Sequence, residues 1–189
     1  MKKQLEECLL NKEWVCIYEG TDHESFIFGT ILGIDDRYCL IYRFDPSGDD
    51  DGVLLIEISS IFRIEVKNKY ARKMQMLIRS KMLIRSKNSI KQLIIENTGV
   101  SKNDSSLSML LNIAKKTERI VSIELLASGI TDIVGQVQSI LEDKIIIRQI
   151  DEYGEVDGMA ICMLNDVTQL SVGSEDERIR EDLITQRDG

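Results

Sequence analysis

The chain is poor in the residue types on which enzymes most often depend. Its 189 residues include a single histidine, His23, and a single proline. The sequence has no GxSxG motif, no phosphate-cradling glycine loop and no cysteine placed beside a base. General-base catalysis needs a partner that positions the histidine, whereas His23 lies between Asp22 and Glu24 in an expected loop. We therefore expect no catalytic residues, no cofactor and no enzymatic activity.

Long apolar runs and paired cysteines are also lacking. A membrane-spanning helix needs roughly 18 consecutive apolar residues, and the sequence has no such run. The apolar stretch near the N-terminus is too short and too broken by charge for a secretion signal. The cysteines form no CxxC pair, and a zinc site needs clustered ligands; they are Cys8, Cys16, Cys39 and Cys162. We expect reduced, mostly buried cysteines, no metal site, and a cytoplasmic protein without membrane contact.

Charge is abundant and unevenly distributed along the chain. The net charge is −8, but residues 67–118 hold 12 basic and 3 acidic residues. On either side, residues 14–66 hold 3 basic and 11 acidic residues, and residues 119–189 hold 6 and 15. A basic segment thus separates two acidic ones.

The chain resembles itself at an offset of 106 residues, which places residues 14–78 on residues 120–184 without a gap. Fourteen of the 65 positions are identical, whereas average composition gives roughly four or five by chance. Glycines and turn aspartates coincide, and such residues are retained for backbone reasons. We infer a tandem duplication of one small module. The identical pairs are Val15/Val121, Ile17/Ile123, Ile27/Ile133, Gly29/Gly135, Ile34/Ile140, Ile41/Ile147, Asp45/Asp151, Gly48/Gly154, Asp51/Asp157, Gly52/Gly158, Val66/Val172, Arg72/Arg178, Leu77/Leu183 and Ile78/Ile184.

Each copy contains five short segments that are rich in Ile, Val, Tyr and Phe and are separated by turn residues, which predicts five strands. Short, strongly curved strands favour a small closed barrel, because closure removes exposed sheet edges. Gly29 and Gly135 fall within strands, where a glycine permits a sharp bend. The predicted strands are 14–19, 26–34, 37–44, 53–58 and 61–66, then 120–126, 132–140, 143–150, 159–164 and 167–172.

Helices are predicted on both sides of each set of strands. In front of the second set, Asp104 or Ser105 can cap a helix whose leucines recur at helical spacing from Leu107 onward, and Leu5 and Leu9 make a weaker version in the first copy. Behind the strands, residues 67–87 and 175–187 favour helices. The predicted fold is mainly β with flanking helices: two tandem five-stranded small barrels, in modules 1–96 and 97–189.

The order of motifs in each copy resembles the Sm-like branch of the SH3-like small barrels. The resemblance is carried by G-x-I and G-x-V in the second strand, by Asp35-Asp36 and Glu142-Asp143 before the third, and by closing I-x-x-I and V-x-x-L segments. It implies a five-stranded barrel. The basic-glycine signature with which that family reads RNA is absent from the fourth strand, where Asp51-Gly52 and Asp157-Gly158 stand instead. RNA binding in the family's manner is therefore not expected.

Both copies carry the motif D-x-x-G-x-x-D-G, at residues 45–52 and 151–158. Aspartate accepts local backbone hydrogen bonds and glycine supplies positive φ, so the motif predicts a turn between the third and fourth strands. The functional alternative is an acidic loop tip that meets a basic partner or holds a cation such as Ca²⁺, although the spacing does not match an EF-hand loop. The candidate residues of these acidic loops are Asp45, Asp49, Asp51, Asp151, Glu155 and Asp157.

The basic segment allows three interpretations. It packs by its apolar face and keeps its charges in solvent; it engages an acidic partner or the acidic barrel of another copy; or it contacts nucleic-acid phosphates. Flanking acidic segments would repel a polyanion, and few aromatics are present for base stacking. We predict protein–protein interaction, self-association or scaffolding through the acidic loops, the barrel edges or the basic segment. The alternative is a nucleic-acid-binding regulator using residues 67–95, and a small ligand between the barrels stays open. The candidate residues of this basic arm are Arg72, Lys73, Arg79, Lys81, Arg85, Lys87 and Lys91.

Overall fold

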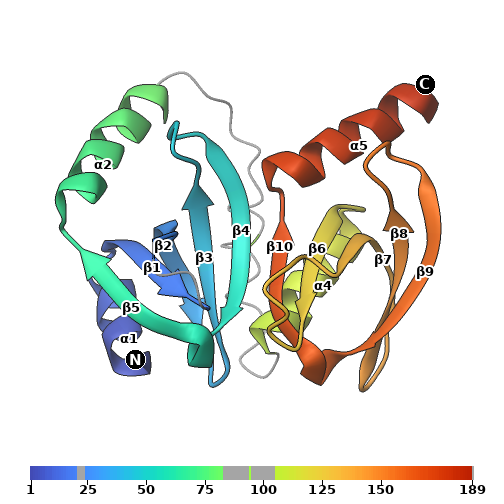
Figure 1. Cartoon of the computed structure of the whole chain (residues 1–189), viewed down its shortest axis with the longest axis horizontal. Coiled ribbons are helices and arrows are strands. Elements are labelled where there is room, and N and C mark those ends of the chain that lie inside the picture. The colour runs from blue at the N-terminus through green and yellow to red at the C-terminus, as the bar shows by residue number, and fades with distance from the viewer. Residues whose placement is uncertain (21–23, 83–93, 95–104, 189) are drawn as a thin grey trace.

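Ten antiparallel strands and four helices make up the part of the chain that the computed structural model describes, which is residues 1–20, 24–82, 94 and 105–188 (Figure 1). The first half of the molecule runs from α1 to α2 and the second from α4 to α5. The elements of the first half are α1 (Lys2–Leu10), β1 (Trp14–Glu19), β2 (Ile27–Ile34), β3 (Tyr38–Phe44), β4 (Asp50–Glu57), β5 (Ile61–Val66) and α2 (Lys69–Met82).

The second half repeats this order of elements. Short 3₁₀ turns, Ile58–Ser60 and Leu164–Asp166, join the last two strands of each half. The predicted strands are found within a few residues, but β4 and β9 begin earlier than predicted, at Asp50 and Val156. The elements are α4 (Ser106–Lys116), β6 (Ile120–Leu125), β7 (Ile133–Ile140), β8 (Lys144–Ile150), β9 (Val156–Met163), β10 (Val167–Val172) and α5 (Glu175–Asp188).

The strands form one open sheet in the order β5-β1-β2-β3-β4-β10-β6-β7-β8-β9. The halves lie side by side and are joined where β4 pairs with β10, with Leu55 opposite Leu170 and Val53 opposite Val172 (Figure 1). Two separate closed barrels are therefore not confirmed. The described ladders run through both halves, and β5 and β9 remain as sheet edges where barrel closure was expected to leave none.

The ladders of the two halves have the same register at the offset of 106 residues. Val15 lies opposite Gly29 in the first half, as Val121 lies opposite Gly135 in the second. The irregularities of the other ladders also recur at this offset. A Cβ atom on either glycine would collide with a carbonyl oxygen of the neighbouring strand. Close approach of two backbones is thus what requires a glycine at both positions.

The hydrophobic core is not divided evenly between the halves. Its larger cluster crosses the junction, because it contains Leu55 of β4, Leu170 of β10 and Leu110 of α4. A smaller cluster lies in the first half, where Leu5 of α1 packs with Ile41 and other strand residues. The expectation of one miniature core in each half is corrected accordingly, since β10 and α4 extend the second half's apolar surface onto the first.

The helices begin at the predicted capping residues or close to them. Ser105, one of the two predicted caps of α4, accepts a hydrogen bond from the backbone of Ser108 at 3.2 Å. Asn68 caps α2 through the backbone N–H of Ala71 at 2.7 Å, so this helix starts two residues later than predicted. The rest of the predicted helix 67–87 and the module boundary at 96–97 lie outside the described residues. No described helix is long and apolar enough to cross a membrane.

Candidate functional site

The first aspartate of each acidic motif closes a hairpin turn. Asp45 accepts a hydrogen bond on Oδ1 from the backbone of Asp49 at 2.7 Å, and Asp151 accepts one from Glu155 at 2.8 Å. Gly48, which follows Asp45 by three residues, has φ +79°. These are the contacts of a turn, and they occupy the carboxylates locally.

The second aspartate of each motif lies within a strand and not at a loop tip, which corrects the predicted placement. Asp51 of β4 pairs with Arg43 Nε at 3.0 Å and accepts a hydrogen bond from the backbone of Glu175 at 3.1 Å. Glu175 is the first residue of α5, so the carboxylate of Asp51 faces the positive end of a helix from the other half. Asp157, at the same offset on β9, is exposed at the sheet edge.

The acidic candidates do not converge on a metal site. Asp49 forms an ion pair with Lys81 Nζ at 2.9 Å. Within the described ranges, no group of three or more His, Cys, Asp and Glu side chains is arranged to hold a metal ion. The described loops therefore give no geometric support to the cation-binding alternative.

The described part of the basic arm is docked on the first half. α2 buries Met74 and Ile78 against the larger core cluster, while Tyr70 meets Phe26 and Phe28 edge to face. The structure brings Lys81 to Asp49 and leaves the candidates Arg72, Lys73 and Arg79 exposed. The remaining candidates, Arg85, Lys87 and Lys91, lie outside the described residues.

Side chains of β3, and of Arg37 immediately before it, reinforce the junction between the halves. The Tyr38 hydroxyl donates to the carbonyl oxygen of Val167 at 2.7 Å, and burial raises the Tyr38 pKa to about 12, which keeps this donor protonated. Arg37 Nη2 donates to the carbonyl oxygen of Asn165 at 2.6 Å. Arg43 Nη2 donates to Ser171 Oγ at 2.9 Å. Sequence reasoning missed these contacts, because nothing local in the sequence pairs β3 with residues about 130 positions later.

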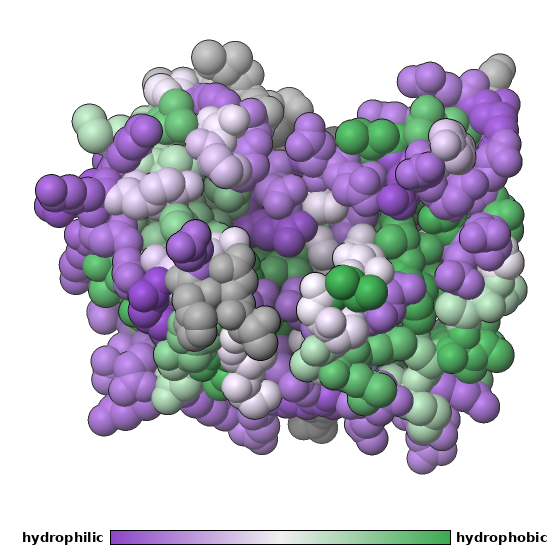
Figure 2. Space-filling model, viewed as in Figure 1, coloured by the Kyte–Doolittle hydropathy of each residue, from purple (hydrophilic) through white to green (hydrophobic). Residues whose placement is uncertain are grey.

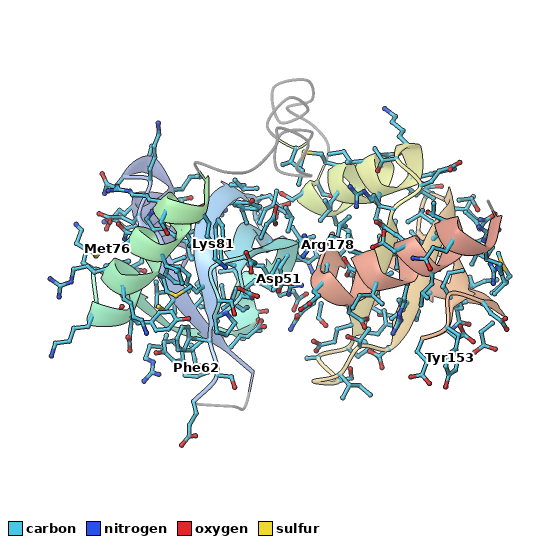
Figure 3. The ribbon with its side chains drawn as sticks, turned by 90° about the horizontal axis from the view of Figure 1, so that it is seen from above. Asp51, Phe62, Met76, Lys81, Tyr153 and Arg178 are labelled. Carbon is cyan, nitrogen blue, oxygen red and sulfur yellow. The ribbon has the colours of Figure 1, made fainter. Side chains whose placement is uncertain are left out.

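α5 adds a further contact to the same junction. Arg178 Nη2 donates to the carbonyl oxygen of Asp50 at 2.7 Å. Figure 3 shows Arg178 and Asp51 close together between the halves. Arg178 thus links the first turn of α5 to the start of β4. This contact lies beside the N-terminus of α5, where the backbone N–H of Glu175 donates to Asp51.

β9 exposes the apolar side chains that its counterpart β4 buries. Val53 and Leu55 of β4 are 0% exposed, whereas Met159 and Ile161, at the same positions of β9, are 54% and 66% exposed. Figure 2 shows apolar surface gathered over this side of the second half. Exposed apolar patches of this kind mark interaction sites on soluble proteins.

The opposite edge of the sheet, β5, borders a groove of about 440 Å³ between this strand and α1. Phe62 and Val66 of β5 are partly exposed there. In the second half, the corresponding elements are β10 and α4, against which β4 and β3 of the first half pack. Within the described chain, neither edge has a strand beside it on its outer side. The groove is lined by Met1, Gln4, Cys8, Phe62, Ile64 and Val66, among others.

A polar cavity of about 400 Å³ also lies between the halves, lined by Arg43, Gln169 and Glu177 among others. Many of its polar groups contact one another or neighbouring backbone: Arg43 binds Ser171, and the buried Glu177 accepts a hydrogen bond from the backbone of Ser174 at 2.8 Å. Next to the cavity, Gln169 donates to Glu19 at 3.1 Å. Burial, with Glu124 nearby, raises the Glu19 pKa to about 6.

Three of the four cysteines, Cys16, Cys39 and Cys162, are buried as core residues are, and Cys8 is partly buried. Burial raises the pKa of the Cys39 thiol to about 12 and also raises the pKa values of Cys16 and Cys162. A thiol of raised pKa stays protonated at neutral pH and is a poor nucleophile. His23 lies outside the described residues.

No protein-family model, curated protein or solved structure matches this chain.

Proposed function

We propose that the chain is a tandem duplication of a small Sm-like barrel module and acts as a non-enzymatic protein-interaction scaffold through its free edges β5 and β9. The duplication is supported by 14 identities at one offset, and by ladders whose registers recur at that offset. Each half then has two edge strands, β5 and β4 in the first half and β10 and β9 in the second. β4 and β10 pair with each other inside the chain, and β5 and β9 are the edges of the whole sheet.

The exposed apolar row of β9 is the observation that carries the function. An edge strand offers unpaired N–H and C=O groups to any other strand, and soluble proteins commonly protect such edges with lysine, proline or charge. The C-terminal part of β9 has the sequence Met-Ala-Ile-Cys-Met over residues 159–163 and contains no lysine, proline or charged residue. An added strand gains backbone hydrogen bonds and apolar contacts at alternate positions, which is how edge-strand recognition works.

The β5 edge differs from the β9 edge in its side chains. Its apolar residues Ile64 and Val66 alternate with Arg63 and Glu65, and the groove beside α1 lies next to them. A strand added to β5 would meet apolar side chains on one face and charged side chains on the other. The two edges are therefore distinct binding surfaces.

The test is a selection of extended peptides from a display library against the folded chain at high dilution, followed by affinity measurements with two lysine variants. Ile161→Lys places a charge among the exposed apolar side chains of β9. Ile130→Lys is the matched control, because Ile130 is equally exposed but lies in the β6–β7 loop. We expect binders with alternating apolar residues whose affinity falls at least about tenfold with Ile161→Lys and does not change with Ile130→Lys. Binders indifferent to Ile161→Lys would contradict the proposal, provided that circular dichroism shows both variants folded.

Nucleic-acid binding is the second candidate function, and the exposed Arg72, Lys73 and Arg79 of α2 favour it. Phosphate contacts make log affinity fall linearly with log salt concentration. A salt titration against RNA and DNA, with a triple alanine variant of these residues as control, tests it. The scaffold proposal expects no binding at low salt, and salt-dependent binding that the triple variant abolishes would favour the nucleic-acid function instead.

A further inference from the structure

The described residues contain four buried polar or charged side chains, and all four line two adjoining cavities between the halves. Ser171, Ser174 and Glu177 line the polar cavity of about 400 Å³. Thr168 lines a neighbouring cavity of about 470 Å³, and Glu124 lines both cavities. Cavities of this size are typical of small-ligand sites. The buried polar groups of the molecule are therefore gathered at one place that a small ligand can enter.

Glu177 is 0% exposed, and one of its two carboxylate oxygens has no partner. Its Oε2 accepts a hydrogen bond from the backbone of Ser174 at the N-terminus of α5 at 2.8 Å. No group in the described part of the chain donates to its Oε1. Burial raises the Glu177 pKa, and the nearby hydroxyls of Ser122 and Ser171 oppose this rise. A buried acceptor without a donor destabilises the fold, so the arrangement calls for a donor supplied by a ligand.

The first half has no counterpart of this polar site. At the offset of 106 residues, Glu177 corresponds to Ala71 and Ser122 to Cys16, which are both 0% exposed and belong to the hydrophobic core. The strand ladders have the same register at these places in both halves. The fold can therefore be built without a carboxyl group at this position. A side chain that costs stability and that the fold does not require is typical of a functional site.

The polar side chains of the cavity form two pairs on neighbouring strands. Ser171 of β10 lies opposite Ser122 of β6, and Gln169 lies opposite Glu124. The two pairs are two residues apart along each strand, so they face the same side of the sheet at a separation of about 7 Å. Gln169 also donates to Glu19 at 3.1 Å, which brings a second partly buried carboxyl group to its end of the site. Acceptor oxygens thus stand at both ends of this span.

The lining of the 400 Å³ cavity is strongly acidic. Five acidic side chains and one basic side chain line it. The basic side chain, Arg43, is already held by Asp51 at 3.0 Å and by Ser171 at 2.9 Å, and Asp51 lies between the halves (Figure 3). Leu54 adds an apolar surface to the lining. The excess of carboxylates favours a cationic ligand, and Leu54 favours one with an apolar middle.

We propose that this cavity binds a short aliphatic diamine, with one ammonium group at Glu177 and the other at Glu124. An ammonium group carries three N–H donors, which meet Glu177 Oε1 and the hydroxyl oxygens of Ser122 and Ser171. Charge-assisted hydrogen bonds of this kind are the strong ones. About four or five methylene groups span about 7 Å between two nitrogens, and they pass beside Leu54.

A diamine explains the site better than a metal ion does. Within the described ranges, no three metal-ligating side chains gather around one point. The acceptors of the cavity are instead spread over a span of about 7 Å and include hydroxyl groups, which suits two separate ammonium groups. The proposal goes beyond the function of the strand edges, because the cavity lies between the halves and its lining contains no residue of β5 or β9.

Isothermal titration calorimetry of the full chain at neutral pH tests the proposal with 1,4-diaminobutane and 1,5-diaminopentane. Each is expected to bind at one site per chain, at least about tenfold more tightly than butylamine, which has a single ammonium group. 1,8-Diaminooctane is too long for the span and is expected to bind at least about tenfold more weakly than the better of the two. An equal concentration of Mg²⁺ is expected not to displace the bound diamine.

Three variants assign the two ends of the ligand. Glu177→Gln removes the charge and keeps the helix cap, because glutamine also serves at this capping position; it is expected to weaken diamine binding at least about tenfold. Glu124→Gln is expected to abolish the preference for the diamine over butylamine. Asp182→Asn makes the same change of charge at an exposed position of α5 outside the cavity, and it is expected to leave the affinity unchanged.

Each other outcome overturns the proposal. No diamine binding at millimolar concentration would do so, as would equal affinities of Glu177→Gln and Asp182→Asn. Equal binding of butylamine and 1,4-diaminobutane by the parent chain would indicate a site for a single ammonium group, and displacement by Mg²⁺ would indicate unspecific attraction of cations. Circular dichroism checks that the variants fold, and Glu124→Gln decides the question alone if Glu177→Gln does not. The peptide selection against β9 tests the proposed function separately.

Discussion

The β4–β10 junction and the free β9 edge place corresponding residues in opposite environments. β4 has a strand on either side, and its Val53 and Leu55 are fully buried. Among the described strands, β9 has only β8 beside it, and its Met159 and Ile161 are exposed. Both strands carry uninterrupted apolar runs at these positions. Burial at these positions is therefore determined by the neighbouring strand, and β9 has the composition of an internal strand.

The acidic motif shows the same contrast. Its first aspartates, Asp45 and Asp151, serve turns in both halves. Of its second aspartates, Asp51 meets Arg43 and α5 in the junction, while Asp157 is exposed. The repeated motif therefore has one structural role that both halves use and one that only the first half uses within the chain.

The largest expected effect comes from truncating the matched apolar residues of the two strands. Leu55→Ala leaves a cavity in the junction and is expected to lower the free energy of unfolding by about 3 kcal/mol. Ile161→Ala removes an exposed side chain and is expected to cost less than about 0.5 kcal/mol in dilute chain. Urea denaturation at high dilution measures both changes. Equal losses would show that β9 is buried in the single chain and would break the comparison.

A somewhat smaller difference is expected between the two matched glycines. Gly52→Ala adds a collision with the backbone of Gly173 to the cost of a left-handed alanine, together about 3 kcal/mol. Gly158→Ala carries only the conformational cost, about 1 kcal/mol, because the space around it is open. Thermal denaturation of dilute chain checks the difference, and Gly129→Ala, also at positive φ in open space, is the control. A Gly158→Ala variant as unstable as Gly52→Ala would be incompatible with an open edge.

The pH dependence of stability tests the junction at Glu19, which accepts a hydrogen bond from Gln169 of β10. Burial raises the Glu19 pKa from its ordinary value of 4.5 to about 6, so ionisation disfavours the folded state. The stabilising contribution of protonated Glu19 is present below about pH 4.5 and is lost as the pH rises through about 6. Glu19→Gln is expected to add roughly 1 to 2 kcal/mol of stability at pH 8 relative to pH 4.5. Denaturant unfolding across this range measures it, with the exposed Glu142→Gln as control; parallel profiles of parent and Glu19→Gln would refute the buried carboxyl.

Local patterns in the sequence predicted the elements but not their assembly. Strand alternation, the glycines and the aspartate turns are properties of neighbouring residues, and the strands lie close to their predicted bounds. The β4–β10 pairing joins residues such as Leu55 and Leu170 that are far apart in sequence, and no local signal specifies such a pair. One signal did point to it: residues 53–56 and 159–163 lack polar alternation, which is typical of strands covered on both sides.

The expectation of two closed barrels is not confirmed, for a related physical reason. Closure needs β4 to pair with β5 of its own half, but in the structure the free side of β4 is taken by β10. Closure was expected because it leaves no exposed sheet edge. The pairing of β4 with β10 protects these two strands equally well. Strand edges were among the interaction surfaces predicted from the sequence, but the sequence did not indicate that β5 and β9 are the edges that remain.

Hydrogen–deuterium exchange of the dilute chain, with and without a peptide selected against it, tests the central claim most directly, because it reports on the backbone of the edge strand itself. Amide protection in β9 is predicted to rise when the peptide binds, while protection in β4 and β10 stays high and constant. Protection in β9 that stays low with the peptide bound would contradict the claim.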